Sequence, residues 1–174
     1  MEYQEKLIDS RTFRDVMGKF ATGVTIVTVQ DENVPHGMTV NSFTSVSLDP
    51  ILVLICLDKD STTTEMLNRT GRFTVNILTA EQVELARRFA ESGNERNRFD
   101  GVDYTLSDEG TPVLHGVSGS MTCKVKDTVE GGDHFIFIGE VVDLEHAFGD
   151  HRPLIYYRGN FKSLADEGLQ DKKG

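Results

Sequence analysis

A glycine turn followed by a histidine and an apolar, β-rich run occupies residues 131–141, Gly-Gly-Asp-His-Phe-Ile-Phe-Ile-Gly-Glu-Val. Histidine titrates near neutral pH, and its ring can donate a hydrogen bond, accept one or stack. At the mouth of such a run His134 is placed to face a ligand, although a lone histidine is more often structural. No second histidine lies at metal-ligand spacing and none has a cysteine partner, so the sequence predicts no zinc site.

A second candidate is the hydroxyl-rich segment 39–47, which adjoins a strongly apolar stretch. Side chains of a regular strand alternate between its two faces. One face would carry Thr39, Asn41, Phe43, Ser45 and Ser47, and the other would carry Ser42 and Thr44. The polar face is either solvated or a row of small donors for a planar, heteroatom-rich ligand such as a flavin. Both faces can line one pocket only where a bulge or a strand end re-aims a side chain.

The segment 56–64 ends a predicted strand, supplies several hydroxyls and begins a predicted helix. Free backbone N–H groups with Ser and Thr hydroxyls at such a junction make an anion site. Lys59 adds a positive charge, which the aspartates on either side of it oppose. The alternative is plain N-capping of the helix by Ser61 or Thr62.

Two arginines and an aromatic residue lie in the stretch 94–101, inside a long polar segment that covers residues 92–112. Loops longer than about 12–15 residues are usually functional or disordered. Arg98 and Phe99 can clamp a phosphate and cover a ring. Equally, they can belong to an ordinary solvated loop.

The elements that must position these residues are short strands with few helices. A helix is predicted over residues 11–21, capped by Ser10, another over 80–91 after Thr79, and a short one near 65–68. The apolar stripe of the first helix, expected to pack in the core, consists of Phe13, Val16, Met17 and Phe20. The predicted strands cover residues 24–29, 38–43, 51–57, 73–78, 117–126, 135–144 and 153–161.

Some of these strands have predicted partners and burial. The strand 51–57 is continuously apolar, which predicts burial on both sides. Residues 24–29 and 38–43 are expected to pair as a hairpin, as are 117–126 and 135–144 around the glycine turn. The chain lacks βαβ alternation and a Gly-x-Gly-x-x-Gly motif, which argues against a Rossmann domain. A closed or half-closed antiparallel barrel with peripheral helices is the expected architecture.

Length and composition limit the class of protein. The chain has 174 residues, which favours one domain, and a formal net charge of -10 at pH 7. That charge argues against nucleic acid and anionic membranes as partners. No apolar run is long enough to span a bilayer and no signal peptide is visible. Cys56 and Cys123 lie in apolar runs, so we expect free thiols and a cytoplasmic protein.

Four blocks in this order resemble the signature blocks of the flavin reductase-like family. They are Phe-Ala-Thr-Gly-Val-Thr-Ile-Val-Thr (20–28), Gly-Met-Thr-Val-Asn-Ser-Phe-Thr-Ser-Val-Ser-Leu-Asp-Pro (37–50), Gly-Asp-His-Phe-Ile-Phe-Ile-Gly-Glu-Val (132–141) and Pro-Leu-Ile-Tyr-Tyr-Arg-Gly (153–159). The resemblance covers about residues 10–163. It implies a mainly β fold, a split β-barrel of the FMN-binding type with peripheral α-helices, as a single domain over residues 1–174 with a frayed tail at 165–174. It also implies a homodimer with the flavin near the subunit interface.

The resemblance implies an NAD(P)H:flavin oxidoreductase that transfers hydride to FAD or FMN and supplies free reduced flavin to a separate monooxygenase. NADH is the expected donor, with NADPH as the alternative. His134 would orient the nicotinamide. The implied cofactor-binding residues are Thr39, Asn41, Ser42, Ser45 and Ser47 at the isoalloxazine, Asp58, Lys59, Ser61 and Thr62 (with Cys56 in the same segment) along the ribityl and phosphate portion, Arg98 and Phe99 over the flavin tail, and His134 and Tyr156 on the nicotinamide side. Two alternatives stay open: a flavoprotein that retains FMN and reduces another acceptor, and a flavin-binding protein without activity.

Overall fold

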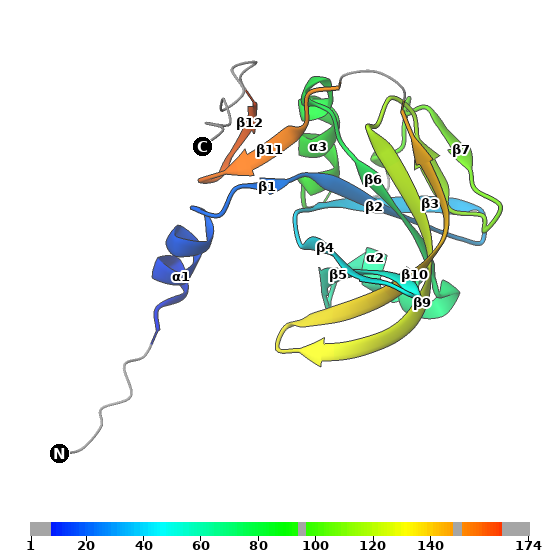
Figure 1. Cartoon of the computed structure of the whole chain (residues 1–174), viewed down its shortest axis with the longest axis horizontal. Coiled ribbons are helices and arrows are strands. Elements are labelled where there is room, and N and C mark those ends of the chain that lie inside the picture. Colours follow the sequence, from blue (N-terminus) through cyan, green and yellow to red (C-terminus); the bar gives the residue numbers. More distant parts are fainter. Residues whose placement is uncertain (1–7, 94–96, 148–150, 165–174) are drawn as a thin grey trace, which may run out of the picture.

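The computed structural model describes residues 8–93, 97–147 and 151–164, and within them the fold is mainly β with few helices (Figure 1). The tail predicted to fray, 165–174, lies outside the described residues. The largest sheet has seven antiparallel strands in the order β3-β2-β6-β9-β10-β5-β4. Their bounds are β2 Thr25–Asp31, β3 Val34–Val40, β4 Phe43–Leu48, β5 Ile51–Asp58, β6 Arg72–Ile77, β9 Gly119–Gly131 and β10 His134–His146.

The seven-stranded sheet is strongly curled (Figure 1). Its two edge strands, β3 and β4, are consecutive in the chain and are separated only by Asn41 and Ser42. Three residue steps span at most about 11 Å, so the opposite edges must approach each other at this point. The hydrogen-bonded strand order nevertheless starts at β3 and ends at β4, so the sheet is not closed.

Smaller elements surround the curled sheet. A three-stranded sheet has the order β1-β11-β12, and β7 pairs with β8. Helix α1 extends away from the body of the protein (Figure 1). Their bounds are β1 Thr22–Gly23, β7 Tyr104–Leu106, β8 Pro112–Leu114, β11 Leu154–Tyr157, β12 Asn160–Ser163, α1 Ser10–Met17, α2 Thr62–Thr70, the short 3₁₀ helix η1 Ala80–Gln82 and α3 Val83–Ala90. α2 begins at Ser61, whose Oγ accepts a hydrogen bond from the Thr64 N–H at 3.2 Å. Capping is therefore what this hydroxyl does here, as one of the two sequence interpretations predicted.

Two apolar clusters form the core. The first fills the inside of the curl and includes Ile55, Leu57, Phe73 and Phe137, all with almost no exposed surface. The second lies between the sheet, α3 and the segment after it, and contains Phe89. The helix predicted over 80–91 is η1 followed by α3, and Ala86 and Phe89 of α3 are fully buried.

The close packing around Gly139 in β10 leads to a prediction about stability. A Cβ added there would lie 2.5 Å from Cζ of Phe73 and 3.0 Å from Cβ of Cys123. We expect Gly139→Ala to lower the free energy of unfolding by about 1–3 kcal/mol, because an overpacked core must shift. Gly23→Ala is the control, since its Cβ would meet no atom within 4 Å. Thermal unfolding of both variants checks this, and equal melting temperatures would contradict it.

The hairpin predicted for residues 117–126 and 135–144 is confirmed, but the boundaries of several other predicted elements differ from the structure. β9 and β10 pair around Gly132, whose φ of 68° requires the left-handed region that glycine tolerates. The expected strand over 38–43 is wrong, because β3 ends at Val40 and β4 begins at Phe43. The expected strand over 153–161 is two strands, β11 and β12, joined by a tight turn. The segment 92–112 includes β7 and buries Thr111, so it is more than a surface loop.

Two predictions of burial are also wrong. Strand β5 alternates, with Val53, Ile55 and Leu57 buried and the residues between them half-buried, because only one of its faces meets the core. Helix α1 ends at Met17, is capped by Asp9 rather than Ser10, and buries no residue. The exposed fractions of the predicted apolar stripe are 57% for Phe13, 58% for Val16, 50% for Met17 and 70% for Phe20, which lies beyond the end of the helix. Helical spacing reveals an apolar stripe but not what covers it.

Both cysteines are free thiols, as predicted, and their burial has a pH consequence. Burial raises the pKa of the Cys123 thiol from 9.0 to about 12. Between these values the unfolded chain releases the thiol proton and the folded chain keeps it, so the free energy of unfolding falls as pH rises. We expect this contribution to reach about 1.4 kcal/mol per pH unit. In Cys123→Ala, the free energy of unfolding measured with denaturant should fall less steeply between pH 9.0 and about 12. An unchanged slope would show that the Cys123 thiol is not the cause of the fall.

Candidate functional site

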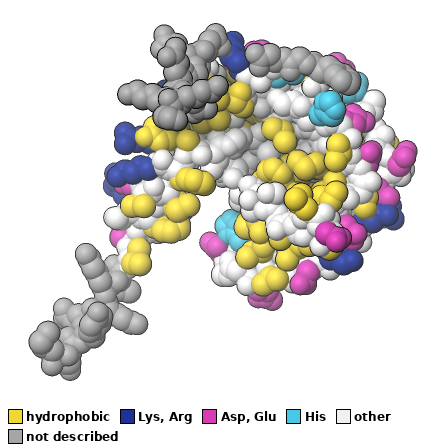
Figure 2. Space-filling view, viewed as in Figure 1, with side chains coloured by type: hydrophobic (Ala, Val, Ile, Leu, Met, Phe, Trp, Pro, Cys, Tyr) yellow, Lys and Arg dark blue, Asp and Glu magenta, His cyan; other side chains and the backbone are white. Residues whose placement is uncertain are grey.

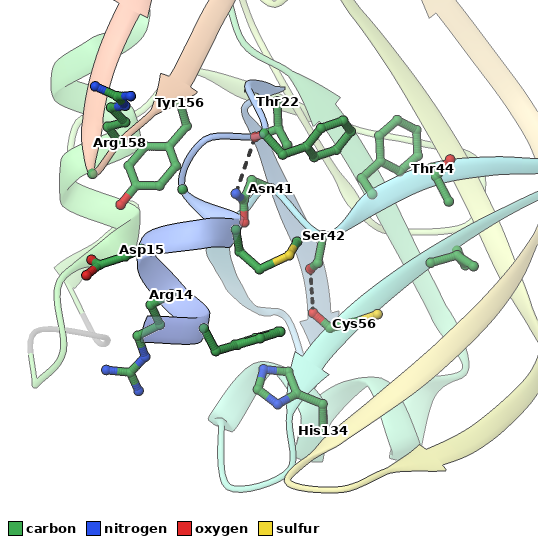
Figure 3. Close-up of a pocket in the computed structure, with 17 residues that line it drawn as sticks. Arg14, Asp15, Thr22, Asn41, Ser42, Thr44, Cys56, His134, Tyr156 and Arg158 are labelled. Atoms are coloured by element: carbon green, nitrogen blue, oxygen red, sulfur yellow. Dashed lines mark hydrogen bonds between the residues drawn. The ribbon is translucent and has the colours of Figure 1, made fainter. Parts of the chain in front are cut away.

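A groove of about 1120 Å³ opens between α1 and the outer face of β4 and β5, with β11 and the turn after it at one end (Figure 3). Figure 2 shows hydrophobic side chains along α1 beside a hollow between the helix and the body of the protein. The residues that line the groove are Phe13, Arg14, Asp15, Met17, Gly18, Phe20, Thr22, Asn41, Ser42, Phe43, Thr44, Leu54, Cys56, His134, Tyr156, Arg158 and Gly159.

The two long walls of the groove are apolar. The alternation of β5 sends Leu54 and Cys56 to the groove while their neighbours enter the core. The other wall comes from α1, whose apolar residues Phe13 and Met17 also line the groove. Aromatic and thioether side chains of this kind pack favourably against planar rings. The walls therefore suit a flat, largely apolar ligand.

A polar edge runs along the groove where the chain crosses from β3 to β4. The Asn41 Nδ2 donates to the Thr22 Oγ1 at 3.3 Å, and the Ser42 hydroxyl donates to the Cys56 carbonyl at 2.7 Å. The Cys56 N–H in turn donates to the Ser42 carbonyl at 3.1 Å. Because the proton of the Ser42 hydroxyl is committed to β5, its oxygen can face a ligand only as an acceptor.

His134 and Tyr156 lie at opposite ends of the groove (Figure 3). His134 is the first residue of β10, pairs with Asp58 of β5, and has a side chain that is 43% exposed. Its Nδ1 is 2.7 Å from the Asp133 carboxylate. A carboxylate can only accept, so Nδ1 carries a proton, and Nε2 is an acceptor whenever the ring is neutral. This hydrogen bond is also the main reason that the pKa of Asp133 is lowered.

Of the predicted site residues, five line the groove: Asn41, Ser42, Cys56, His134 and Tyr156. Thr39 does not, because its hydroxyl donates to the Ala86 carbonyl at 2.7 Å on the α3 side. Ser45 and Ser47 continue along β4 past the groove, with a register shift between them. The break at residues 41–42 explains the difference, since it re-aims the two residues at the crossing and leaves the rest of β4 to run on.

The predicted phosphate residues after β5 have other partners. The Lys59 ammonium pairs with Glu130 at 2.9 Å and lies 5.0 Å from the centre of the Phe135 ring. The Asp58 carboxylate accepts the Asp60 N–H at 2.8 Å, which shapes the loop before α2. Asp58, Lys59, Ser61 and Thr62 thus adjoin the His134 end without lining the groove.

Neither Arg98 nor Phe99 lines the groove, and Phe99 packs against the second core cluster. Arg98 is 5% exposed, and its guanidinium donates to the carbonyls of Gly37, at 2.8 Å, and of Glu91. Phe99 packs edge-on against Phe89, with ring centres 5.1 Å apart. These contacts hold the segment after α3 against the sheet.

Sequence reasoning missed one whole wall of the groove. Phe13, Arg14, Asp15 and Met17 come from α1, whose apolar spacing predicts core packing instead. Arg158 and Gly159 come from the turn between β11 and β12. The signal for α1 was its apolar spacing, but spacing alone cannot distinguish a core face from a ligand-facing one. The signal for Arg158 was its place in the fourth of the blocks described above.

The described part of the chain shows neither a metal-binding cluster nor a membrane-spanning helix. Within residues 8–93, 97–147 and 151–164, no three His, Cys, Asp or Glu side chains are arranged to hold a metal ion. The same part of the chain contains no helix with the length and apolar character needed to cross a membrane.

Comparisons with known proteins agree with one another. The flavin-dependent monooxygenase reductase subunit HsaB of Mycobacterium tuberculosis is 38% identical over 161 residues, which cover 92% of this chain and 85% of that protein. The FMN reductase (NADH) SmoA of Agrobacterium fabrum is 41% identical over 153 residues, which cover 88% of this chain and 85% of that protein.

A solved structure extends the likeness to the fold. The NADH:FAD oxidoreductase SgcE6 of Streptomyces globisporus, in complex with NAD and FAD fragments, superposes with a TM-score of 0.86 at 40% identity and covers 94% of this chain and 99% of that chain. The family model described as "Flavin reductase like domain" matches residues 17–165. The chain therefore belongs to the flavin reductase-like family.

Proposed function

We propose that the protein is an NAD(P)H-dependent flavin reductase that transfers hydride to FAD or FMN and supplies free reduced flavin to a separate monooxygenase. The observation that carries this proposal is the groove itself. It has two apolar walls, a polar edge at Asn41 and Ser42, and His134 at one end, in a chain of the flavin reductase-like family.

The residues present fit a flavin. An isoalloxazine ring needs flat apolar contact on its faces and hydrogen-bonding groups along its pyrimidine edge. Leu54 and Met17 supply the first on opposite walls, and Asn41 with the Ser42 oxygen supplies the second. A volume of about 1120 Å³ exceeds that of a typical small-molecule pocket, which leaves space for a nicotinamide ring beside the flavin.

When both are bound, the nicotinamide supplies the hydride and the flavin accepts it, so the chain needs no nucleophile. The protein contributes position and exclusion of water. The walls formed by α1 and β5 would pack against the flavin and nicotinamide rings and exclude water from them. His134, with Nδ1 fixed by Asp133, presents Nε2 to orient the carboxamide of the nicotinamide. The side chains that form the two apolar walls, among them Leu54 and Met17, carry no charge, which is consistent with modest affinity and release of reduced flavin.

We further propose that the curled sheet is a split β-barrel of the FMN-binding type and that the chain forms one domain. Support comes from the two-residue link between the edge strands β3 and β4 and from the antiparallel order of the seven strands. The two apolar clusters share strand β2, which supports a single folding unit.

A homodimer with the groove near its interface is also part of the proposal. The stripe on α1 is exposed, and the edge formed by β4 and the start of β5 exposes Val46, Leu48 and Ile51, with 89% exposure for Leu48. Exposed apolar patches of this kind commonly mark protein–protein contacts. A second copy of the chain is the partner that we expect to cover them.

Oxidation of NADH and NADPH with added FAD, FMN or riboflavin, or with no flavin, tests the activity. The proposal predicts turnover that depends on added flavin. Turnover by the purified protein without added flavin would instead favour a flavoprotein that retains FMN. Flavin binding with no turnover under any of these conditions would leave a carrier and contradict the proposal.

A further inference from the structure

We propose that Arg14 and Arg158 form a phosphate-recognition site at the α1–β11 end of the groove. The ligand is a phosphate ester, carried either by the flavin nucleotide or by the nicotinamide dinucleotide. This inference rests on the proposed function of the groove.

The backbone of Arg158 is the first observation. Tyr157 pairs with Asn160, so Arg158 and Gly159 form a two-residue hairpin turn with φ values of 49° and 74°. Turns with positive φ at both positions favour Asn-Gly, and an arginine at the first position is strained. A strained backbone retained in a ligand groove points to a role for its side chain.

The turn itself does not need this side chain. The Arg158 N–H donates to the Gly18 carbonyl at 2.8 Å, which ties the turn to the end of α1. Its carbonyl accepts from the Asn160 Nδ2 at 2.8 Å. Both contacts use main-chain atoms that asparagine would supply equally well without the strain. What arginine adds is its guanidinium.

The distribution of charge along the groove is the second observation. At the His134 end, Asp58, Asp60 and Asp133 are close in the fold, and the ammonium of Lys59 is already paired with Glu130. The buried guanidinium of Arg98 is likewise committed to backbone carbonyls. In a chain with a net charge of -10, this end of the groove repels an anion.

The opposite end carries the cations. Arg14 and Arg158 both line the groove and are exposed, and neither forms an ion pair with a carboxylate among the described residues. Asp15 is the acidic residue that lines the same end. Figure 3 shows Arg158 beside Tyr156 and Arg14 on α1, both on the far side of the groove from Ser42 and Cys56.

This arrangement suits a nucleotide whose rings lie between the apolar walls and whose phosphate emerges at the rim. A guanidinium binds phosphate oxygens bidentately and keeps its charge at all accessible pH values. The Arg158 guanidinium rests over the Tyr157 ring, with its Cζ 5.3 Å from the ring centre. The backbones of Arg14 and Arg158 are close, because Gly18 donates to the Arg14 carbonyl and accepts from the Arg158 N–H, both at 2.8 Å. Their side chains extend in different directions (Figure 3), so both guanidiniums must turn toward the groove to bind one phosphate group.

The test compares Arg158→Asn, Arg14→Gln and the double variant with Arg11→Gln, whose parent residue is on α1 but does not line the groove. Asparagine is chosen because it tolerates the left-handed backbone, so the melting temperature of Arg158→Asn should stay equal or rise. Equilibrium binding of FMN and of riboflavin is measured by quenching of flavin fluorescence, without turnover. In the kinetic arm, KM for NADH is compared with KM for 1-benzyl-1,4-dihydronicotinamide, which has no phosphate.

We expect the double variant to lose about tenfold or more in affinity for one phosphate-bearing ligand, with no matching loss for its phosphate-free analogue. A loss for FMN but not riboflavin assigns the site to the flavin phosphate. A rise in KM for NADH but not for the benzyl compound assigns it to the nicotinamide dinucleotide. Unchanged values throughout, or equal losses for both members of each pair, would overturn the inference. If the wild-type protein binds FMN better than riboflavin but reduces neither, the proposed function fails. The FMN and riboflavin affinities of the arginine variants would then still test the phosphate site.

Discussion

Replacing His134 with alanine is expected to raise KM for NADH by about tenfold or more, because one hydrogen bond to the dinucleotide is worth about 1.4 kcal/mol. The imidazole is held by Asp133 at 2.7 Å and faces the groove, so its loss removes a positioned acceptor rather than core packing. Steady-state kinetics at saturating riboflavin measures the effect. Riboflavin affinity, followed by fluorescence, should change little, since the ring walls stay intact.

The matched control for this variant is His115→Ala. His115 is an exposed histidine outside the groove, and its main-chain carbonyl, which accepts from Gln82, is retained in alanine. It should leave KM for NADH unchanged. Unchanged turnover and KM in His134→Ala would show that the histidine is structural, as a lone histidine most often is.

The second large effect is expected when the apolar face of α1 is made polar. We expect Phe13→Ser combined with Met17→Ser to weaken riboflavin binding by about tenfold or more, because each apolar side chain that packs on a ligand contributes about 1.5–3 kcal/mol when fully buried. The melting temperature of the protomer should hardly change, since α1 buries no residue in the chain. Fluorescence titration and thermal unfolding together provide the measurement.

Val16→Ser is the control on the same helix. Val16 is as exposed as Phe13 but does not line the groove, so riboflavin affinity should survive its replacement. The molar mass of Val16→Ser in solution is measured as well. A lower mass than that of the wild-type protein, with riboflavin affinity unchanged, would show that Val16 contacts the second subunit rather than the ligand. If the double variant bound riboflavin as tightly as the wild-type protein, α1 would not be a wall of the flavin site.

The sequence predicts correctly those elements that are formed by residues close to one another in the chain. The β9–β10 hairpin follows from alternation on both sides of a glycine turn, and the turn brings its own partners together. The N-cap at Ser61 is equally local, because its acceptor and donor are three residues apart. The position of His134 is also predictable from local sequence, because the glycine turn that places it directly precedes it in the chain.

What failed depends on contacts distant in the chain. The composition of residues 37–50 does not show that one strand ends before Asn41 and another begins after Ser42, because both strands are strand-like in sequence. They differ only in their pairing partners, since β3 pairs with β2 and β4 pairs with β5. The half-buried face of β5 could not be read from a uniformly apolar run. Its place in a polar stretch predicts Arg98 as a phosphate ligand, but its guanidinium donates instead to main-chain carbonyls, one of them that of Gly37.

Anaerobic mixing of the purified protein with NADH and a molar excess of free FMN, FAD or riboflavin tests the central claim most directly. The groove described here predicts that each molecule of NADH consumed yields one molecule of reduced flavin over many turnovers, and that the reduced flavin passes through an ultrafiltration membrane that retains the protein. Reduction that stops after one equivalent per protomer, with the flavin retained alongside the protein, would contradict a reductase that releases its product.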